Sequence, residues 1–253
     1  MNQNDYKDQF VWIIGASSGI GLALAQELSA RGAILALTAR RKPELEKLKA
    51  DLGGRHKVFA LDLTDARATL LTAQAICAAF GRIDRIIFLA AAYAPMKMDS
   101  LDITLVKGIV DINLIGAFNL AHAVLPIFKT QKSRGQFALC GSVAGYIGLP
   151  YGQPYSATKA AIINLAETLY AEFGDTLDIK LISPGFVRTQ LTDKNNFHMP
   201  MIIEPEQAAK EIAHGLMSQR FEIHFPKKFI FMLKILRSLP YALSLRLTRI
   251  IKT

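Results

Sequence analysis

The sequence predicts an α/β fold with a doubly wound parallel sheet, a Rossmann-type three-layer α/β/α architecture. Short apolar runs alternate along the chain with segments whose apolar residues recur at helical spacing. The runs are apolar almost throughout, which is typical of strands buried on both faces and therefore of parallel sheets. A repeated strand–helix order with right-handed crossovers produces this architecture.

Seven strands and six helices are expected in the main part of the chain. The predicted strands are 9–15, 33–39, 57–63, 85–91, 135–142, 178–185 and 221–225. The predicted helices are 19–32, 43–54, 66–81, 101–128, 154–174 and 204–219. Gly32 suits a C-cap, and Pro43 suits the first turn of a helix. We assign residues 1–225 to one domain and 226–253 to a basic, amphipathic, helical C-terminal extension.

Composition narrows the class of protein. The chain has 253 residues, of which 51% are hydrophobic and 20% charged, so disorder and coiled coils are excluded. No apolar run reaches the roughly 18 residues expected of a spanning helix, and the N-terminus does not resemble a signal peptide. Cys77 and Cys140 fit reduced thiols and lack metal-ligand spacing. We therefore expect a cytoplasmic protein without a metal.

The net charge of +9 is concentrated in the C-terminal extension. No acid follows Glu222, and seven lysines and arginines follow from Lys227 onward. This distribution argues against a nucleic-acid binder, because the main domain has little excess charge. The extension predicts two short amphipathic helices separated at Pro240. Such helices suit the inner face of an anionic membrane, and they would also suit packing on the domain or on a second subunit.

The glycine-rich segment GASSGIG joins the first strand to the first helix. Gly15 permits a sharp turn, Gly19 leaves the backbone open to a pyrophosphate, and Gly21 lets the helix approach the sheet. The helix N-terminus attracts an anion through its free N–H groups, and Ser17 and Ser18 can donate further hydrogen bonds. The segment could be a turn that binds nothing, but the flanking strand and helix favour a dinucleotide site.

The spacing Gly-x3-Gly-x-Gly resembles that of the short-chain dehydrogenase/reductase family, over about residues 9–225. The resemblance implies a nicotinamide cofactor, a small-molecule carbonyl or alcohol substrate, and often a homo-oligomer. The chain departs from the family at Ile14, where Thr is usual. It also has Phe-Leu-Ala-Ala at 88–91, where many members have Asn-Asn-Ala-Gly. Ala90 and Ala91 remain small enough for the cofactor to approach.

The end of the second strand predicts the type of cofactor. In NAD-binding members of the family an acid here binds the adenosine ribose, and it would repel the 2′-phosphate of NADP. This chain has no acid in 33–42 and offers Arg40 and Arg41, whose guanidinium groups pair well with phosphate. We predict NADP(H) rather than NAD(H), although the arginines could also be a solvated helix cap. Asp62 and Leu63 match the family's adenine-contacting pair.

Three residues form a candidate catalytic set. Ser142 ends the fifth strand, Tyr155 begins the next helix, and Lys159 lies one turn further on the same face. Hydride transfer at a carbinol carbon requires proton transfer at its oxygen, and a nearby ammonium would lower the tyrosine pKa from about 10. Ser142 can bind the substrate oxygen. A Tyr-x3-Lys pair alone is common on solvated helices, but Ser142 and the glycine loop favour catalysis.

The resemblance adds further residues to the site. Asn113 matches a residue that kinks its helix and supports a proton relay to the lysine, so it joins the catalytic set. The segment SPGFVRT after the sixth strand would cross the nicotinamide. The predicted cofactor-binding residues are Gly15, Ser17, Ser18, Gly19, Ile20, Gly21, Arg40, Arg41, Asp62, Leu63, Ala90, Tyr155, Lys159, Pro184, Gly185, Val187 and Thr189.

Residues 190–203 fall where the family has its substrate lid. The apolar side chains expected to line a pocket there are Tyr93, Val143, Leu149, Phe197, Met199, Met201 and Ile202, and His198 is expected to be exposed. Flexible methionines suit an irregular apolar ligand. The predicted function is an NADP(H)-dependent oxidoreductase that interconverts a ketone or aldehyde and an alcohol of hydrophobic or lipid-like character. The alternative is a non-catalytic NADP(H)-sensing or scaffold protein.

Overall fold

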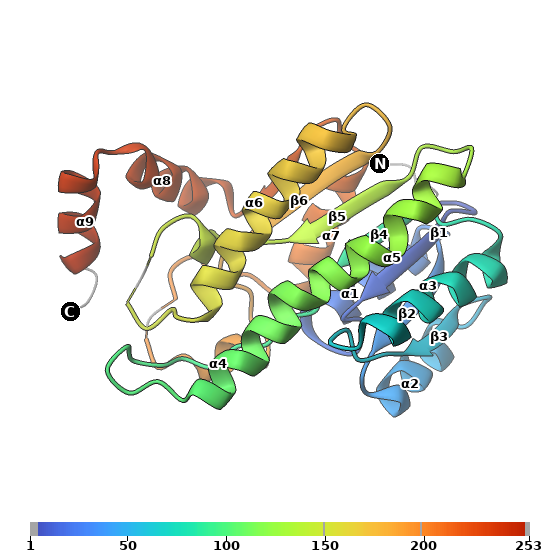
Figure 1. Cartoon of the computed structure of the whole chain (residues 1–253), viewed down its shortest axis with the longest axis horizontal. Helices are drawn as coiled ribbons and strands as arrows, with labels where there is room; N and C mark the ends of the chain where they lie inside the picture. The colour runs from blue at the N-terminus through green and yellow to red at the C-terminus, as the bar shows by residue number, and fades with distance from the viewer. Residues whose placement is uncertain (1–4, 149, 198, 251–253) are drawn as a thin grey trace.

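The computed structural model describes residues 5–148, 150–197 and 199–250. These residues form a seven-stranded sheet in the order β3-β2-β1-β4-β5-β6-β7 (Figure 1). All neighbouring strands pair in parallel. The strands are β1 (Phe10–Ile14), β2 (Ile34–Ala39), β3 (Lys57–Ala60), β4 (Arg85–Phe88), β5 (Gln136–Cys140), β6 (Asp178–Pro184) and β7 (Glu222–Phe225). The predicted doubly wound fold is confirmed.

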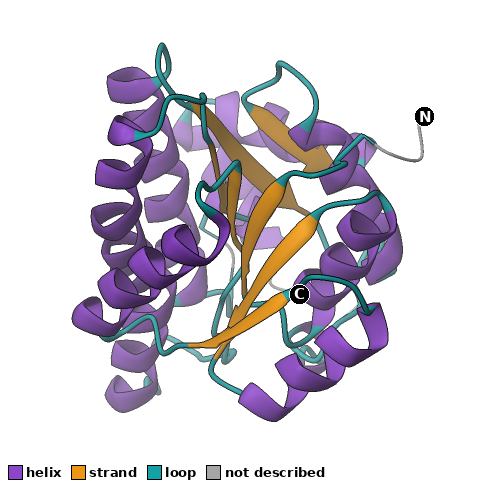
Figure 2. Cartoon of the chain, turned by 90° about the vertical axis from the view of Figure 1, so that its right-hand side faces the viewer, coloured by secondary structure: helices purple, strands orange, loops and turns teal. Residues whose placement is uncertain are grey.

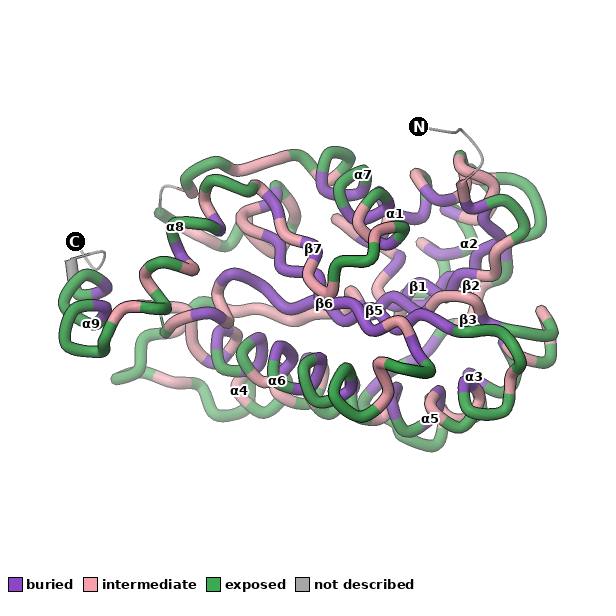
Figure 3. Tube along the Cα trace, turned by 90° about the horizontal axis from the view of Figure 1, so that it is seen from above, coloured by how far each residue is buried: buried purple, intermediate pink, exposed green. Residues whose placement is uncertain are grey.

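Helices cover both faces of the twisted sheet (Figure 2). The helices are α1 (Gly19–Ala30), α2 (Lys42–Leu52), α3 (Ala66–Phe80), α4 (Ile103–Val110), α5 (Gly116–Thr130), α6 (Tyr155–Phe173), α7 (Pro205–Leu216), α8 (Lys227–Ser238) and α9 (Tyr241–Ile250). One face carries α1, α2 and α7, and the other carries α3, α4, α5 and α6 (Figure 3). The chain order reverses between β1 and β4, and ligands bind at such switch points.

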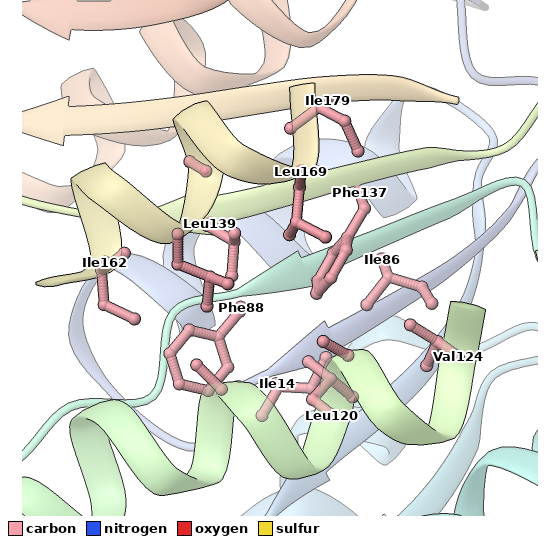
Figure 4. Packing of buried hydrophobic residues seen from close by; sticks show 14 of the residues in the cluster. Ile14, Ile86, Phe88, Leu120, Val124, Phe137, Leu139, Ile162, Leu169 and Ile179 are labelled. Atoms are coloured by element: carbon pink, nitrogen blue, oxygen red, sulfur yellow. The ribbon is translucent and has the colours of Figure 1, made fainter. Parts of the chain in front are cut away.

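Side chains from α5 and α6 build the larger core against the sheet. Leu120 and Val124 of α5 face Ile14 and Ile86, whereas Ile162 and Leu169 of α6 lie over the strands β5 and β6 (Figure 4). Ile230 and Leu233 of α8 belong to the same buried cluster, so this helix is anchored on the domain.

The edge strand β3 differs from the sequence expectation. It ends at Ala60 instead of residue 63, and its two terminal residues are exposed. The reason is that β3 pairs only with β2, which itself ends at Ala39, opposite Ala60. The residues after Ala60 leave the sheet and run toward the carboxyl ends of the strands.

The predicted helix 101–128 is interrupted. Between α4 and α5 the chain forms a π-helical turn, η1 (Asp111–Ile115), where one extra residue widens the helix. The combined helix 103–130 has a window of mean hydropathy 1.5 and by length and composition alone could span a membrane, although polar residues interrupt its apolar runs. Its inner side is buried in the core, however, which accounts for that composition.

Truncation of Phe88 tests the core packing. Phe88 is fully buried between the sheet and the helices of the larger cluster. Phe88→Ala leaves a cavity and is expected to lower the free energy of unfolding by roughly 3–5 kcal/mol. Urea denaturation followed by circular dichroism measures the change. The matched control is Phe118→Ala, whose side chain is 50% exposed, with an expected change of less than about 1 kcal/mol. Equal losses would contradict this packing.

Candidate active site

A cavity of about 760 Å³ lies at the carboxyl ends of the strands. Its wall includes the last residues of β1, β2, β5 and β6. Every residue of the predicted cofactor-binding set lines it, as does Ser142. Asn113 is the one predicted site residue that does not. The structure thus brings together segments that lie far apart in the sequence, from Ile14 to Lys194.

The glycine loop has no room for side chains at two positions. Gly15 has a φ of +96°, and a Cβ there would lie 2.8 Å from the backbone nitrogen of Ala90. A Cβ at Gly21 would lie 2.1 Å from the carbonyl oxygen of Gly15. The N–H groups of Gly15 and Ala16 both donate to the carbonyl of Thr38. The loop is therefore fixed against β2 and against the segment after β4.

The N-terminus of α1 opens into the cavity without a competing anion. Ser18 is the N-cap residue, yet its side chain makes no capping hydrogen bond, and the first turn contains no acid. Gly19, Ile20 and Gly21 of this turn line the cavity. The N–H groups of a first helical turn lack helical partners and carry partial positive charge. This set of donors fits the diphosphate of a nicotinamide dinucleotide.

Two arginines extend the positive charge from the end of β2. The Nη2 of Arg41 donates to Ser17 Oγ at 3.1 Å, and its Nη1 lies 3.5 Å from Glu44 Oε1. Arg40 is exposed and lines the same cavity. Asp62, which also lines the cavity, has a lowered pKa because Thr64 donates backbone and side-chain hydrogen bonds to it, with a smaller effect from Arg40.

Ser142, Tyr155 and Lys159 converge on one part of the cavity wall. Ser142 Oγ accepts a hydrogen bond from the N–H of Ala144 at 3.1 Å, so its own proton is available to another acceptor. Lys159 is buried, and its Nζ donates to the carbonyl of Cys140 at 2.7 Å. The same Nζ lies 5.5 Å from the centre of the Tyr155 ring. The cation and the phenol are therefore neighbours, without a direct hydrogen bond.

The electrostatics of the pair differ from the sequence expectation. Burial raises the pKa of Tyr155, the Cys140 thiol adds to this, and the hydroxyl of Ser142 opposes it. Burial also lowers the pKa of Lys159. Burial thus outweighs the lowering of the tyrosine pKa that was expected from the neighbouring lysine. The ammonium is directed at the Cys140 carbonyl instead of the phenol oxygen, and burial disfavours the phenolate.

Asn113 lies behind the site, within the π-helical turn. Its Oδ1 accepts from the N–H of Ala92 at 2.7 Å, and its Nδ2 donates to the carbonyl of Ala92 and to Thr158 Oγ1, both at 3.0 Å. Thr158 Oγ1 in turn donates to the carbonyl of Tyr155 at 2.8 Å. Asn113 therefore positions the start of α6 relative to the segment after β4, and it does not line the cavity.

The segment after β6 closes the cavity over the glycine loop. The N–H of Gly185 donates to the carbonyl of Phe225 at 2.8 Å, and Val187 pairs with Ile203. Thr189 approaches Gly19 so closely that a Cβ on that glycine would lie 3.1 Å from the Thr189 methyl group. Sequence reasoning did not identify Thr192, whose hydroxyl donates within this turn to the carbonyl of Val187. No local motif marks that residue.

The predicted apolar substrate pocket is not assembled as expected. Met201 and Ile202 line a separate cavity of about 460 Å³ beside β7, and Val143 is part of the buried core. Ile203, the residue after Ile202, pairs with Val187. Phe197 packs on the Phe186 ring and is 48% exposed. Leu149 and His198 lie outside the described residues, and Met199 is partly buried beside Asn195.

Tyr93 is the predicted pocket residue that does reach the catalytic centre. Its ring packs edge-on against Tyr155, with 5.1 Å between the centroids, and its hydroxyl donates to Asn195 Oδ1 at 2.6 Å. Sequence reasoning missed Lys194, which lines the cavity and donates to the carbonyl of Tyr93 at 2.8 Å. These contacts connect the lid to the segment after β4.

A partly buried network links α8 to the loop after Ser142, and the sequence did not predict it. Tyr146, four residues after Ser142, donates to Glu222 Oε1, and Lys234 of α8 donates to Glu222 Oε2. Burial favours a raised pKa for Glu222, but the hydrogen bonds from Lys234 and Tyr146 outweigh it and the pKa is lowered. Glu222 therefore stays ionised between its two donors.

Comparisons with known proteins agree on one family. Residues 9–199 match the family model described as short chain dehydrogenase. The chain is 33% identical over 232 residues to an uncharacterized oxidoreductase of Myxococcus xanthus, covering 90% of this chain and 91% of that one. It is 33% identical over 192 residues to 11-beta-hydroxysteroid dehydrogenase 1A of Arabidopsis thaliana, covering 74% of this chain. The matched region spans about half (54%) of that plant relative.

Solved structures share the fold. A short-chain dehydrogenase/reductase from Burkholderia phymatum, solved in complex with NAD, superposes with a TM-score of 0.84 at 20% identity, covering 92% of this chain and 94% of that chain. A short-chain dehydrogenase from Streptomyces avermitilis gives 0.81 at 23% identity, covering 89% and 91%.

The buried Lys159 is expected to reduce stability at neutral pH. Because burial lowers its pKa, the folded protein holds this proton less tightly than the unfolded chain does. The cost is largest below the folded-state pKa and disappears as the pH rises past the ordinary value of 10.5. Lys159→Met should therefore be more stable than the parent at neutral pH, by about 1 kcal/mol or more.

Urea unfolding at several pH values measures this gain, which should shrink as the pH approaches 10.5. Lys210→Met, at an exposed position of α7, is the control and should show no such trend. A Lys159→Met protein that is less stable at neutral pH would contradict the assignment.

Proposed function

The chain belongs to the short-chain dehydrogenase/reductase family, and from this premise we propose that it is an NADP(H)-dependent oxidoreductase that interconverts a hydrophobic ketone or aldehyde and the corresponding alcohol. One observation carries the proposal. Ser142, Tyr155 and Lys159 line the same cavity as the glycine loop and the N-terminus of α1. We assign cofactor binding and catalysis to residues 1–225.

Tyr155 acts as the acid in the reducing direction. A bound nicotinamide supplies the hydride to the carbonyl carbon. Negative charge then develops on the substrate oxygen, which accepts hydrogen bonds from Ser142 and Tyr155. The phenol transfers its proton to that oxygen, and the Lys159 ammonium stabilises the phenolate that remains. The raised pKa of Tyr155 keeps the phenol protonated before the reaction, which suits a proton donor. In the oxidising direction the proton returns to the phenolate.

The preference for NADP(H) is supported by the charge at the end of β2. Arg40 and Arg41 line the cavity, and no acid stands in 33–42 to repel a 2′-phosphate. The hydrogen bond from Arg41 to Ser17 orients the guanidinium at the edge of the glycine loop. The Arg40 side chain is exposed beside it, and its planar set of donors suits a phosphate.

The apolar character of the substrate is supported by two observations. The ring of Tyr93 lies against Tyr155, where the substrate carbonyl must sit, and Phe186 and Phe197 form an aromatic pair beside the closing segment. Several relatives are 11-beta-hydroxysteroid dehydrogenases, at 33–34% identity. A ketone on a fused-ring or long-chain apolar body is therefore the first class of substrate to assay.

Tyr155→Phe tests the function itself. With NADPH and a panel of ketosteroids and 3-keto lipids, the variant should lose about 10²- to 10⁴-fold in turnover, because it lacks the proton donor. NADPH binding, measured by the fluorescence of the reduced cofactor, should be retained. Tyr151→Phe, whose side chain is 43% exposed, is the matched control with parental activity. Parental protein that binds NADPH yet reduces none of these ketones would favour a sensor or scaffold.

Removal of the two arginines tests the cofactor. The double variant Arg40→Ala/Arg41→Ala should raise the KM for NADPH by at least roughly tenfold, since the loss of even one charge-assisted hydrogen bond costs about 1.5–3 kcal/mol. The KM for NADH should change little, because NADH has no 2′-phosphate. Lys42→Ala, also exposed and next in sequence, is the control. A parental enzyme that uses only NADH would refute the NADP(H) proposal.

A further inference from the structure

The two C-terminal helices present an unusually apolar outer surface. The exposed apolar side chains of α8 and α9 are between 45% and 81% exposed and are Phe231, Met232, Ile235, Tyr241, Leu243, Leu245 and Leu247. We call this set, together with the neighbouring exposed cations, the tail surface. Both Figure 1 and Figure 3 place α9 at the end of the molecule, away from the sheet. Exposed apolar patches of this kind mark interaction sites.

The helix α9 packs on the rest of the chain through a polar side and leaves its apolar side exposed. Its buried side chains are polar, Ser244 at 2% and Thr248 at 6% exposure, four residues apart on one side of the helix. Its leucines point to solvent. The amphipathic helix α7 shows the opposite arrangement, with Ile212 and Leu216 buried. Packing on the domain, one of the alternatives that the sequence left open, therefore accounts for the inner side of α8 and the polar side of α9, but not for the exposed leucines.

The charges on the tail surface select the class of partner. Lys227, Lys228, Arg237, Arg246 and Arg249 are exposed, and no acid follows Glu222 in the sequence. A two-fold dimer through this surface would set cations against cations, because an isologous interface pairs the same patch with itself. An anionic surface complements it. Cations interleaved with apolar residues on short helices are typical of interfacial membrane binding.

We propose that the tail surface binds the interface of a lipid bilayer that contains anionic lipids. The helices have 12 and 10 residues, so each is too short to span the hydrocarbon core and instead lies in the interface. The leucines and aromatic residues enter the boundary between headgroups and acyl chains, and the five cations pair with lipid phosphates and carboxylates.

Docking in this way places the closing segment of the active site beside the membrane. The ring of Phe229 in α8 packs on that of Phe186, with 5.6 Å between the centroids. Phe186 follows Gly185, which lines the cavity, and Phe229 and Pro226 both lie against that glycine. An apolar substrate dissolved in the bilayer then has a short path to the site. This consequence rests on the proposed function, whereas the docking itself does not.

Co-sedimentation of the full chain with vesicles tests the docking without any measure of activity. The chain should sediment with phosphatidylcholine–phosphatidylserine vesicles, and much less with phosphatidylcholine alone or at high salt. Each cation near an anionic surface contributes about fivefold in partitioning. Arg246→Gln/Arg249→Gln should therefore weaken binding by about 25-fold. Arg67→Gln/Lys132→Gln, which removes two exposed cations from the main domain, should leave binding unchanged.

A fluorescent reporter identifies the occupant. The single tryptophan, Trp12, is buried in β1 and donates to Thr38, so its emission should not respond to vesicles. The variant Tyr241→Trp, at a position 81% exposed, should gain emission that shifts to shorter wavelength on anionic vesicles and is quenched by brominated lipid.

Three outcomes would overturn the proposal. The first is equal sedimentation of the two double variants, Arg246→Gln/Arg249→Gln and Arg67→Gln/Lys132→Gln. The second is emission from Tyr241→Trp that does not shift on anionic vesicles. The third is a shift of the Tyr241→Trp emission to shorter wavelength in vesicle-free solution that accompanies self-association of the protein. That result would assign the tail surface to a second copy of the chain.

Discussion

The buried amide of Asn113 holds together the segments on which the whole site depends. Its Oδ1 accepts a hydrogen bond from the N–H of Ala92, and its Nδ2 donates to the Ala92 carbonyl and to Thr158 Oγ1. These bonds join the segment after β4 to the first turn of α6. The π-helical turn is what directs this side chain inward, because the extra residue shifts the helical register between α4 and α5. Tyr155, Thr158 and Lys159 all lie at the start of α6. The hydrogen bonds of Lys159 to the Cys140 carbonyl and of Ser156 to the Ala144 carbonyl fix the same turn against β5 and the loop after it.

The site is assembled at a cost to stability. An ammonium is fully buried at Lys159, where a single carbonyl at 2.7 Å replaces its hydration shell. Burial of this kind costs free energy, since the Coulombic and hydrogen-bond gains seldom offset the lost solvation. The buried cation lies beside the Tyr155 ring, where it can stabilise a phenolate, and burial at the same place raises the pKa of Tyr155.

The sequence predicted what local patterns encode. The alternation of buried strands with helices, the glycine loop and the positions of Ser142, Tyr155 and Lys159 follow from patterns a few residues long. The cavity brings the glycine loop and these three residues together. The sequence did not predict the contacts between distant segments. No sequence pattern near Tyr146 predicts that Glu222, 76 residues away, accepts its hydrogen bond. The lining of the substrate pocket was predicted incorrectly for the same reason. The segment is held by the pairing of Val187 with Ile203, and composition does not encode that pairing.

The helix α8 connects the catalytic loop to the tail surface. Its inner side buries Ile230 and Leu233 in the core, and its Lys234 holds Glu222, which holds Tyr146 in the loop that begins at Ser142. Its outer side carries exposed apolar and basic residues. One ion pair and one hydrogen bond thus join α8 to the loop that begins at Ser142, so the same helix contacts both that loop and the solvent on its outer side.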